Sequence, residues 1–266
     1  GEISRYALSV VDRLQQAGYQ AYLVGGCVRD LLLNLEPKDF DVATSATPEQ
    51  VRAEFRNARV IGRRFKLVHV HFGREIIEVA TFRANHPQGD EDEDSNLSSR
   101  NESGRILRDN VYGSLEDDAQ RRDFTINALY LDASCERILD YANGVHDIRN
   151  RLIRLIGDPE KRYQEDPVRM LRAVRFAAKL DFDIEKHSAA PIPRLARLLH
   201  EIPSARLFDE VLKLFLAGNA EHTFELLLEY NLFAPLFPAA AAALKRDPEY
   251  AGELIRLALA STDRRI

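Results

Sequence analysis

The pattern of the sequence changes near residue 158, and this change constrains the fold more than any other feature. Before it, short β-rich runs are interspersed with amphipathic helical stretches. After it, apolar residues recur only at helical spacing, as in DPVRMLRAVRFAAKL from Asp166 to Leu180. The chain is therefore expected to form a mixed α/β part followed by an all-helical part.

Local signals place several elements in the first part. A helix is expected over residues 4–17, and another begins after Thr47, which can cap it, with Pro48 in its first turn. The β-rich runs KLVHVHFG and EIIEVATFR are joined by Gly73-Arg74 and predict a hairpin, and ALYLDA and RILDYANG predict two further strands. The polar, acidic residues 84–104 predict a mobile loop.

The composition bounds the class of protein. With 45% hydrophobic and 30% charged residues over 266 positions, it is ordinary for a globular protein of one or two domains. No apolar run approaches the length of a membrane span, and the amphipathic start is not a secretory signal. Cys27 and Cys135 lie far apart and outside any CxxC pair, which argues against a zinc knuckle and favours a cytoplasmic location.

The charge is unevenly distributed. The net charge of −5 disfavours nucleic acid as a partner, because phosphate backbones attract basic surfaces. Residues 149–179, however, contain nine basic side chains against four acidic ones, whereas residues 90–94 form an acidic block. The total charge therefore conceals a basic middle segment.

The run KDFDV places Asp39 and Asp41 two positions apart. On a strand, two such side chains face the same side. Mg²⁺ binds one or two carboxylates together with substrate phosphates, and a pair of ions can clamp both oxygens of a phosphoryl displacement. Glu78 is a candidate third carboxylate, with a strand-edge acid as the alternative. By itself, the pair favours a solvated turn that bears two acids.

The apolar run YQAYLV ends at Gly25 and Gly26, and Arg29 follows in the next predicted helix. Glycines let the backbone approach a ligand closely, and amides at the start of a helix can bind an anion. Together with the two aspartates, they predict a site for a metal-bound triphosphate. Taken singly, the glycines could form a tight turn, and Arg29 could pair with Asp30 on the surface.

Two further segments carry groups that suit a nucleotide. In RRDFTIN, residues 121–127, the arginines offer planar forks for phosphate, and Asp123 could accept a ribose hydroxyl. The alternative is a charged helix end in which Asp123 pairs with a neighbouring arginine.

Asp166 and Arg169 lie three residues apart and face the same way on a helix. An acceptor beside a donor matches the edge of adenine, and one good bidentate base contact discriminates by about 1–3 kcal/mol. Arg172 continues this stripe and could reach phosphates. The structural alternatives are an N-cap role for Asp166, with Pro167 as the first helical residue, and a solvated helix face for the arginines.

Taken in order, these segments resemble the motifs of the nucleotidyltransferases that extend RNA 3′ ends without a template, the bacterial poly(A) polymerases and the related CCA-adding enzymes. LVGGCVRDLLL with PKDFDV is similar to the catalytic motif, and RRDFTINAL to the ribose motif. DYANGVHDIRNRLIRLIG, with Asp140, Gly144 and Asp147, is similar to the connecting motif, and EDPVRMLRAVRFAAKL to the base-reading motif. VIGRRFKLVHV, residues 60–70, resembles the poly(A) branch.

The resemblance covers nearly the whole chain and implies its organisation. We expect an α/β nucleotidyltransferase head, built as a small mixed β-sheet with helices, over residues 1–148. A neck that recognises the nucleotide base is expected at 149–185, and an all-α body that binds RNA at 186–266. Poly(A) polymerases normally carry a longer basic C-terminal extension, so the chain is expected to be a catalytic core cut from a longer protein.

The resemblance also implies an activity, the transfer of AMP from ATP to an RNA 3′-hydroxyl with release of pyrophosphate. Two Mg²⁺ ions, which Mn²⁺ can replace, are expected to take part. The implied catalytic residues are Asp39, Asp41 and Glu78, of which Asp39 and Asp41 bind metal. The implied nucleotide-binding residues are Gly25, Gly26, Arg29, Arg122, Asp123, Asn127, Asp166, Arg169 and Arg172. The implied RNA-binding residues are Arg63, Arg64 and Lys66.

Two alternatives remain open from the sequence. A CCA-adding enzyme, which uses CTP as well as ATP on tRNA, shares every one of these motifs. A non-catalytic RNA-binding module on the same fold is disfavoured by the intact acidic residues and Arg169. The expected partners are RNA 3′ ends and ATP, whereas the RNAs that are tailed, the oligomeric state and any RNA-decay or RNA-chaperone protein partner cannot be read from the sequence.

Overall fold

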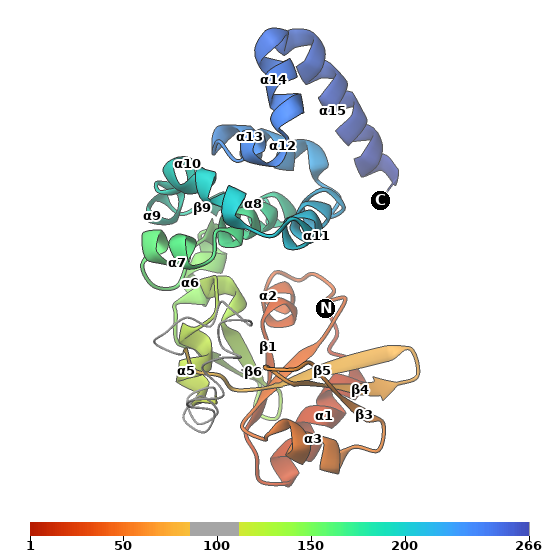
Figure 1. Cartoon of the computed structure of the whole chain (residues 1–266). Coiled ribbons are helices and arrows are strands. Elements are labelled where there is room, and N and C mark those ends of the chain that lie inside the picture. Colours follow the sequence, from red (N-terminus) through yellow and green to blue (C-terminus); the bar gives the residue numbers. More distant parts are fainter. Residues whose placement is uncertain (86–111, 266) are drawn as a thin grey trace. The chain divides into compact units, whose positions relative to one another are not determined.

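A computed structural model describes residues 1–85 and 112–265 of the chain. The chain divides into two compact units, Gly1–Arg149 and Asn150–Ile266, and each is described by itself. The first holds a mixed sheet with helices and the second is mainly helical, which confirms the predicted fold class (Figure 1). The finer division at residue 185 stays a prediction, and most of the predicted loop at 84–104 lies outside the described residues.

The first unit is built on a seven-stranded sheet with the order β3-β4-β5-β2-β1-β6-β7. Its strands are β1 (Ala21–Val24), β2 (Asp41–Thr44), β3 (Ala58–Ile61), β4 (Leu67–Phe72), β5 (Glu75–Thr81), β6 (Leu129–Asp132) and β7 (Arg137–Asp140). β2 and β5 pair in parallel, and the other neighbours pair antiparallel. The predicted hairpin around Gly73 and the two later strands are confirmed, whereas the edge strand β3 was not predicted.

The helices of the first unit are short. They are α1 (Arg5–Gln16), α2 (Gly26–Leu32), α3 (Pro48–Glu54), α5 (Leu115–Gln120), the 3₁₀ turn η1 (Thr125–Asn127) and α6 (Gly144–Arg149). α1 and α3 lie side by side against the sheet, and α2 packs on β1, β6 and η1 (Figure 1). α2 therefore packs next to the end of β1, where the predicted site residues Gly25 and Gly26 lie.

The predicted helix starts are confirmed by their caps. The Ser4 hydroxyl accepts hydrogen bonds from the amides of Tyr6 and Ala7 at the start of α1. Thr47 and Gln50 form a reciprocal capping box at α3, with Pro48 in its first turn. α1 buries one face of apolar side chains, and full burial of each Val or Leu among them is worth about 1.5–3 kcal/mol. These side chains are Ala7, Val10, Val11 and Leu14.

The second unit consists of helices and one minimal sheet. Its helices are α7 (Pro159–Glu165), α8 (Val168–Leu180), α9 (Lys186–Ala189), α10 (Ile192–Leu195), η2 (Ala196–Glu201), α11 (Ser204–Phe215), α12 (Ala220–Glu229), α13 (Phe233–Leu236), α14 (Pro238–Arg246) and α15 (Pro248–Arg265). β8 (Leu152–Ile153) and β9 (Asp183–Ile184) pair in parallel. The expectation of helices alone after residue 158 was therefore wrong at β9, because two residues are too few to show a strand pattern.

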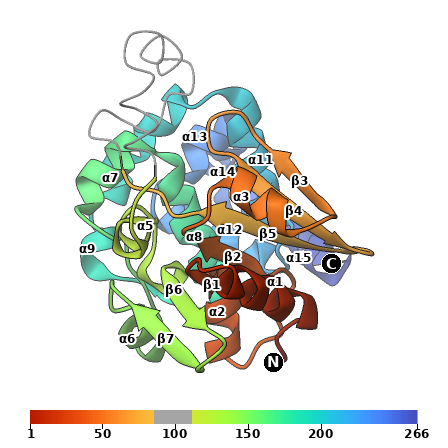
Figure 2. The same ribbon diagram turned by 90° about the horizontal axis from the view of Figure 1, so that it is seen from below.

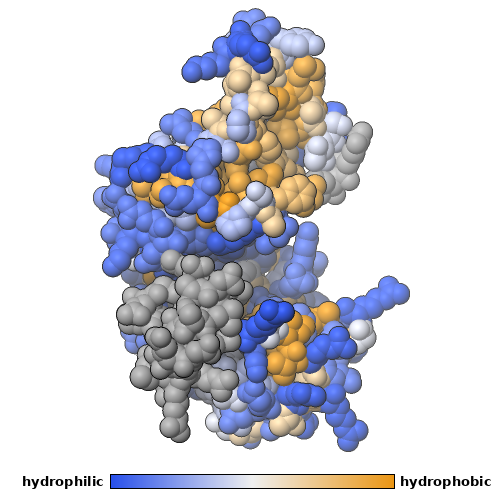
Figure 3. Space-filling model, viewed as in Figure 1, coloured by the Kyte–Doolittle hydropathy of each residue, from blue (hydrophilic) through white to orange (hydrophobic). Residues whose placement is uncertain are grey.

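Apolar side chains of the second unit are both buried and exposed. α8 buries Met170, Leu171 and Val174 completely. In contrast, α11 and α15 expose large apolar side chains, and Figure 3 shows apolar surface gathered over the C-terminal helices. These exposed side chains are Phe208 and Leu212 of α11, Leu216 directly after it, and Tyr250, Leu254 and Leu257 of α15. Among the residues that the structure describes, no helix combines the length and apolar character needed to cross a membrane.

The close packing of α6 against η1 generates a test of the fold. A Cβ on Gly144 would collide with the Thr125 carbonyl oxygen and stand 2.9 Å from its carbonyl carbon. Because these are backbone atoms, Gly144→Ala is expected to destabilise the protein by about 1–3 kcal/mol, measured by urea unfolding. The control Gly252→Ala, on α15, meets only side-chain atoms, the end of Arg256 at 3.3 Å and Cδ2 of Leu244 at 3.6 Å, and is expected to be neutral or stabilising. Equal effects of the two substitutions would contradict this packing.

Candidate active site

One row of registered residues crosses the centre of the sheet in the first unit. Val24 on β1 pairs with Asp41 on β2, and Asp41 pairs with Glu78 on β5. On its other side, Val24 pairs with Tyr130 on β6, and Glu78 pairs with His69 on β4. Directly paired residues point to the same face of a sheet. The three adjacent strands, shown from below in Figure 2, thus carry Asp41 to a position between the end of β1 and Glu78.

Asp41 sits in an environment that disfavours its negative charge. Burial, together with the neighbouring Glu78 and Asp39, raises the pKa of Asp41 to about 6, while Arg122 and His69 act in the opposite direction. Asp41 is partly buried at the start of β2, whereas Asp39, two residues earlier, is exposed. A hard divalent cation, which prefers oxygen ligands, would relieve this repulsion. The carboxylates of Asp39 and Asp41 therefore fit such an ion.

Glu78 has a second partner in the structure. Its carboxylate lies 3.3 Å from Nε2 of His69, and 39% of its side chain is exposed. Within residues 1–85 and 112–265, no three His, Cys, Asp or Glu side chains gather closely enough to hold a metal ion. Glu78 therefore lies beside Asp41 as expected, and its role as a third carboxylate stays a prediction.

The Gly25 turn brings a different segment of the chain to the end of β1. Gly25 has a φ of +79°, which favours glycine, and its amide donates to the Leu129 carbonyl oxygen. A Cβ there would stand 3.7 Å from the Asn127 carbonyl oxygen and 3.8 Å from Nη1 of Arg122. The bare turn thus lies against two of the residues predicted to bind the nucleotide.

Arg29 lies on the inner side of the turn. It is 3% exposed, and its guanidinium donates to the Asn127 side-chain oxygen at 2.7 Å and to the Asp30 carboxylate at 2.9 Å. The pairing with Asp30 was weighed as an alternative from the sequence, although we expected it on the surface. In this conformation Arg29 orients Asn127, and its expected contact with phosphates stays a prediction. A Cβ on Gly26 would stand 3.4 Å from Arg29.

The RRDFTIN segment follows α5 and leads into η1. The Asp123 carboxylate accepts the amide of Phe124 at 2.7 Å. Thr125 donates to Asp147 at 2.6 Å, which ties the segment to the connecting motif in α6. Sequence reasoning missed Asp118, a buried residue of α5 whose carboxylate accepts from Arg121, Arg122 and Tyr130. The spacing of three and four residues to the two arginines is the signal that could have identified it.

In the second unit, the two residues predicted to read the base are held by ion pairs. Asp166 ends α7 and does not cap α8, because Pro167 precedes the first residue of α8; its Oδ1 nevertheless accepts the Val168 amide at 3.3 Å. Its Oδ2 accepts from Arg206 of α11 at 2.6 Å. Arg169 donates to the Arg162 carbonyl oxygen at 2.9 Å and lies 3.6 Å from Glu165.

The remaining predicted arginines lie on helical and loop surfaces. Arg172 stands 5.7 Å from the Phe176 ring centre on α8, as a cation over an aromatic ring. Arg63, Arg64 and Lys66 occupy the connection between β3 and β4. There the Phe65 ring lies 4.9 Å from the Arg64 guanidinium. The predicted contact of this connection with RNA stays a prediction.

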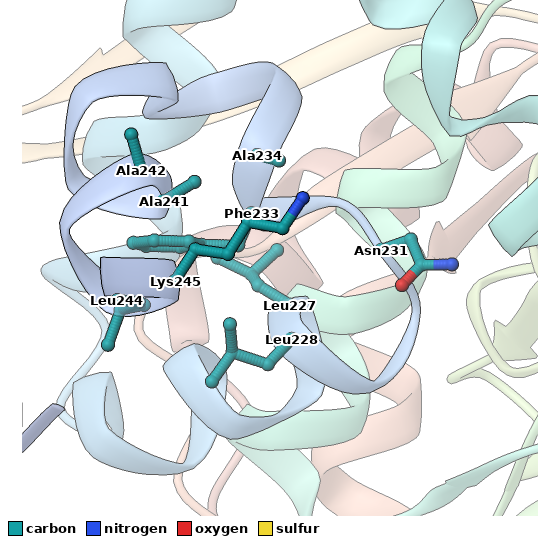
Figure 4. Close-up of a pocket in the computed structure, with 9 residues that line it drawn as sticks. All are labelled: Leu227, Leu228, Asn231, Phe233, Ala234, Ala241, Ala242, Leu244 and Lys245. Atoms are coloured by element: carbon teal, nitrogen blue, oxygen red, sulfur yellow. The ribbon is translucent and has the colours of Figure 1, made fainter. Parts of the chain in front are cut away.

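A pocket of about 680 Å³ lies between helices of the second unit that carry no residue predicted for chemistry. Figure 4 shows Leu227 and Leu228 of α12 on one side and Leu244 and Lys245 of α14 on another. Phe233 and Ala234 of α13 complete much of its wall. The pocket is mainly apolar and lacks the grouped carboxylates found in the first unit.

The raised pKa of Asp41 generates a prediction for stability. In the unfolded chain this carboxyl titrates near 3.8, and in the folded protein near 6. Between these values the folded state binds the additional proton, so stability falls as the pH rises through this window. Asp41→Asn is therefore expected to raise the free energy of unfolding at pH 8 in EDTA, by up to about 3 kcal/mol, less the share screened by solvent.

The gain should disappear at pH 4, where the wild-type carboxyl is largely protonated in the folded state. Urea unfolding at the two pH values measures the difference. Asp39→Asn, at the exposed neighbouring position, is the matched control and is expected to change stability little. A stability gain for Asp41→Asn that is the same at pH 4 and pH 8 would rule out this electrostatic origin.

Comparisons with known proteins match both units of the chain. The family described as "Poly A polymerase head domain" matches residues 21–154, which include the row around Asp41 and the Gly25 turn. A second family, described as "Probable RNA and SrmB- binding site of polymerase A", matches residues 181–244 of the second unit.

Individual relatives give the same assignment. Poly(A) polymerase I of Salmonella typhimurium is 58% identical over 266 residues, which are 100% of this chain and 57% of that protein. A CCA-adding enzyme of Lactobacillus helveticus is 38% identical over 226 residues, 85% of this chain and 53% of that protein. The chain thus spans little more than half the length of these curated relatives.

A solved structure shares the fold. The CCA-adding enzyme of Bacillus stearothermophilus in complex with CTP superposes with a TM-score of 0.72 at 37% identity, covering 86% of this chain and 52% of that one. The family match extends over half of the chain and includes the sheet that carries the two aspartates and the glycine turn. From its sequence, its sheet and this site, the chain belongs to the poly(A) polymerase family, to which the CCA-adding enzymes are related.

Proposed function

We propose that the chain transfers AMP from ATP to the 3′-hydroxyl of RNA. The observation that carries this proposal is Asp41 beside the Gly25 turn and Arg122, in a chain 58% identical to a poly(A) polymerase I over its whole length. In the reaction, the RNA 3′-oxygen forms a bond to the α-phosphorus of ATP. The bond between that phosphorus and the oxygen that bridges the α- and β-phosphates breaks. Pyrophosphate leaves with the electron pair of that bond, and the hydroxyl proton is released.

Asp39 and Asp41 would hold the divalent cations, because their carboxylates supply hard oxygen ligands and Asp41 is destabilised by neighbouring acids. When bound, Mg²⁺ supplies charge neutralisation at the triphosphate and acidifies the attacking hydroxyl, in a two-ion arrangement. Glu78 adds negative charge next to Asp41 and contributes to attracting these ions.

The turn and the segment after α5 would orient the nucleotide. Gly25 leaves the backbone bare, and Arg122 presents its guanidinium to that turn, so a triphosphate lying there meets a positive charge. Asp123 is the acceptor for a ribose hydroxyl, and Asn127 is held by Arg29 on the inner side. Catalysis on this scheme consists mainly of positioning and charge stabilisation.

Asp166 and Arg169 would read the base. The ion pair with Arg206 and the Val168 amide restrict the Asp166 carboxylate to one orientation, which a specific acceptor needs. Arg169 is restricted in the same way by Glu165 and the Arg162 carbonyl. The adenine edge offers a donor and an acceptor to such a pair. The RNA would contact the second unit, where residues 181–244 match a family described as an RNA-binding site.

Incorporation of each labelled nucleotide tests this proposal. In the presence of Mg²⁺, the protein should add long ATP-only tails to an oligoadenylate primer. Asp39→Ala should abolish incorporation while the circular dichroism spectrum and melting temperature stay unchanged. Retained activity in this variant would contradict the assignment of the metal ligands.

The relatives favour one alternative activity. Because CCA-adding enzymes are 38% identical to this chain, a tRNA lacking its CCA end serves as the second primer. Addition of CTP confined to that tRNA would assign the protein to the CCA-adding branch. Absence of incorporation on both primers would overturn the proposed transfer.

Arg169→Ala is expected to reduce the preference for ATP over CTP by about tenfold, because one bidentate base contact is lost. The ratio of kcat/KM for the two nucleotides measures the preference. Arg197→Ala, at an exposed position of η2, is the matched control and should leave the ratio unchanged. An unchanged ratio in Arg169→Ala would remove Arg169 from base recognition.

A further inference from the structure

The first unit contains a buried carboxylate that the proposed reaction does not use. Asp118 is 1% exposed, and each of its two carboxylate oxygens accepts hydrogen bonds from a different set of partners. Oδ1 accepts from the amide of Arg83 at 2.9 Å and from Nη2 of Arg121 at 3.0 Å. Oδ2 accepts from the hydroxyl of Tyr130 at 2.5 Å and from Nη2 of Arg122 at 3.2 Å.

These partners make a buried negative charge stable. Burial by itself disfavours the charged form, yet the arginines and the Tyr130 hydroxyl hold the pKa of Asp118 below its ordinary value. The carboxylate therefore stays ionised at neutral pH and keeps accepting from both arginines. Removing such a charge leaves the guanidinium groups around it without their main counter-charge.

The hydrogen bonds to Asp118 determine the orientation of the Arg122 guanidinium. Asp118 holds Nε of Arg122 at 3.3 Å as well as Nη2, so two nitrogens along one edge of the guanidinium face the carboxylate. The third nitrogen, Nη1, lies 3.8 Å from the position of a Cβ on Gly25. A planar guanidinium fixed along one edge has little freedom to turn the remaining nitrogen elsewhere.

The sheet places this arrangement on the face that carries Asp41. Tyr130 and Asp41 are both paired with Val24, on its two sides, and therefore point to the same face. Arg122 donates to the Tyr130 hydroxyl at 3.3 Å, and its guanidinium lies 5.7 Å from the centre of the Tyr130 ring. Tyr130 thus supports the guanidinium on the side of the sheet where the phosphates would bind.

We propose that Asp118 is a positioning residue for the nucleotide triphosphate, because it holds Arg122 with one edge fixed and Nη1 directed at the Gly25 turn. This inference rests on the proposed function, since it takes the site to bind a nucleoside triphosphate. Asp118 itself touches no phosphate and acts through Arg122 alone. Arg121 donates to the other oxygen, Oδ1, and takes no part in this positioning.

Binding of ATP compared with adenosine tests the proposal in the full chain. In Asp118→Asn, the charge is lost and an amide donor replaces one of the two acceptor oxygens, so the edge of Arg122 is held less firmly. The affinity for ATP should fall about tenfold or more, as for loss of a contact between charged groups. The affinity for adenosine, which lacks phosphates, should stay within about twofold, and titration calorimetry measures both.

Three further variants separate positioning from folding. Glu116→Gln, at an exposed position of the same helix, is the matched control and should change neither affinity. Tyr130→Phe removes one hydroxyl and should lower ATP affinity less than Asp118→Asn does, which keeps a readout if Asp118→Asn fails to fold. Asp118→Asn and Arg122→Ala should be strongly non-additive for ATP, because both remove the same contact.

Equal losses of ATP and adenosine affinity in Asp118→Asn, or in Tyr130→Phe where Asp118→Asn does not fold, would overturn the proposal. Additive effects of Asp118→Asn and Arg122→Ala would also overturn it. Both readouts are binding measurements, so they do not require transfer of AMP. If the wild type binds ATP but incorporates none into RNA, the proposed function fails while the positioning of Arg122 is still decided.

Discussion

The register of the central strands is the constraint on which the site of the first unit depends. A single row joins His69, Glu78, Asp41, Val24 and Tyr130, so one pairing pattern sets the neighbours of Asp41 on both sides. A slip by one residue would turn each of these side chains to the opposite face. Buried residues such as Val42 and Val79, which alternate with the polar ones, prevent that slip. The hydrophobic core thus specifies the electrostatics of the site.

The acidic residues and the basic residues of this face depend on each other. Burial and neighbouring acids raise the pKa of Asp41, and Arg122 partly offsets this effect. Arg122 in turn keeps its place through Asp118, whose own charge is stabilised by two arginines and Tyr130. This mixture of charges suits a cation and a polyanion together, which is the combination that the proposed function requires for a nucleoside triphosphate.

Much of this arrangement could be predicted from local patterns, and the rest required long-range pairing. The β-rich runs around Gly73 and the cap at Thr47 are local signals, and both predictions were correct. Arg29 was expected to face phosphates, but burial against Asn127, 98 residues away, cannot be seen in a local pattern. The same holds for Asp118, because its partner Arg83 lies just after β5 and its partner Tyr130 lies on β6. Asp166 and Arg169 were predicted to read the base from their spacing, which stays a prediction, and the Asp166 partner Arg206 lies on a distant helix.

The attachment of Arg83 to this network also bears on how the head domain tolerates change in its sequence. Arg83 and Tyr112 form an antiparallel bridge, Gly113 donates to Phe82, and the Arg83 amide is held by Asp118. The chain thus leaves and re-enters the sheet beside Asp118. A substitution of Asp118 would therefore affect two features together, the hold on Arg122 and the place where the chain leaves the sheet.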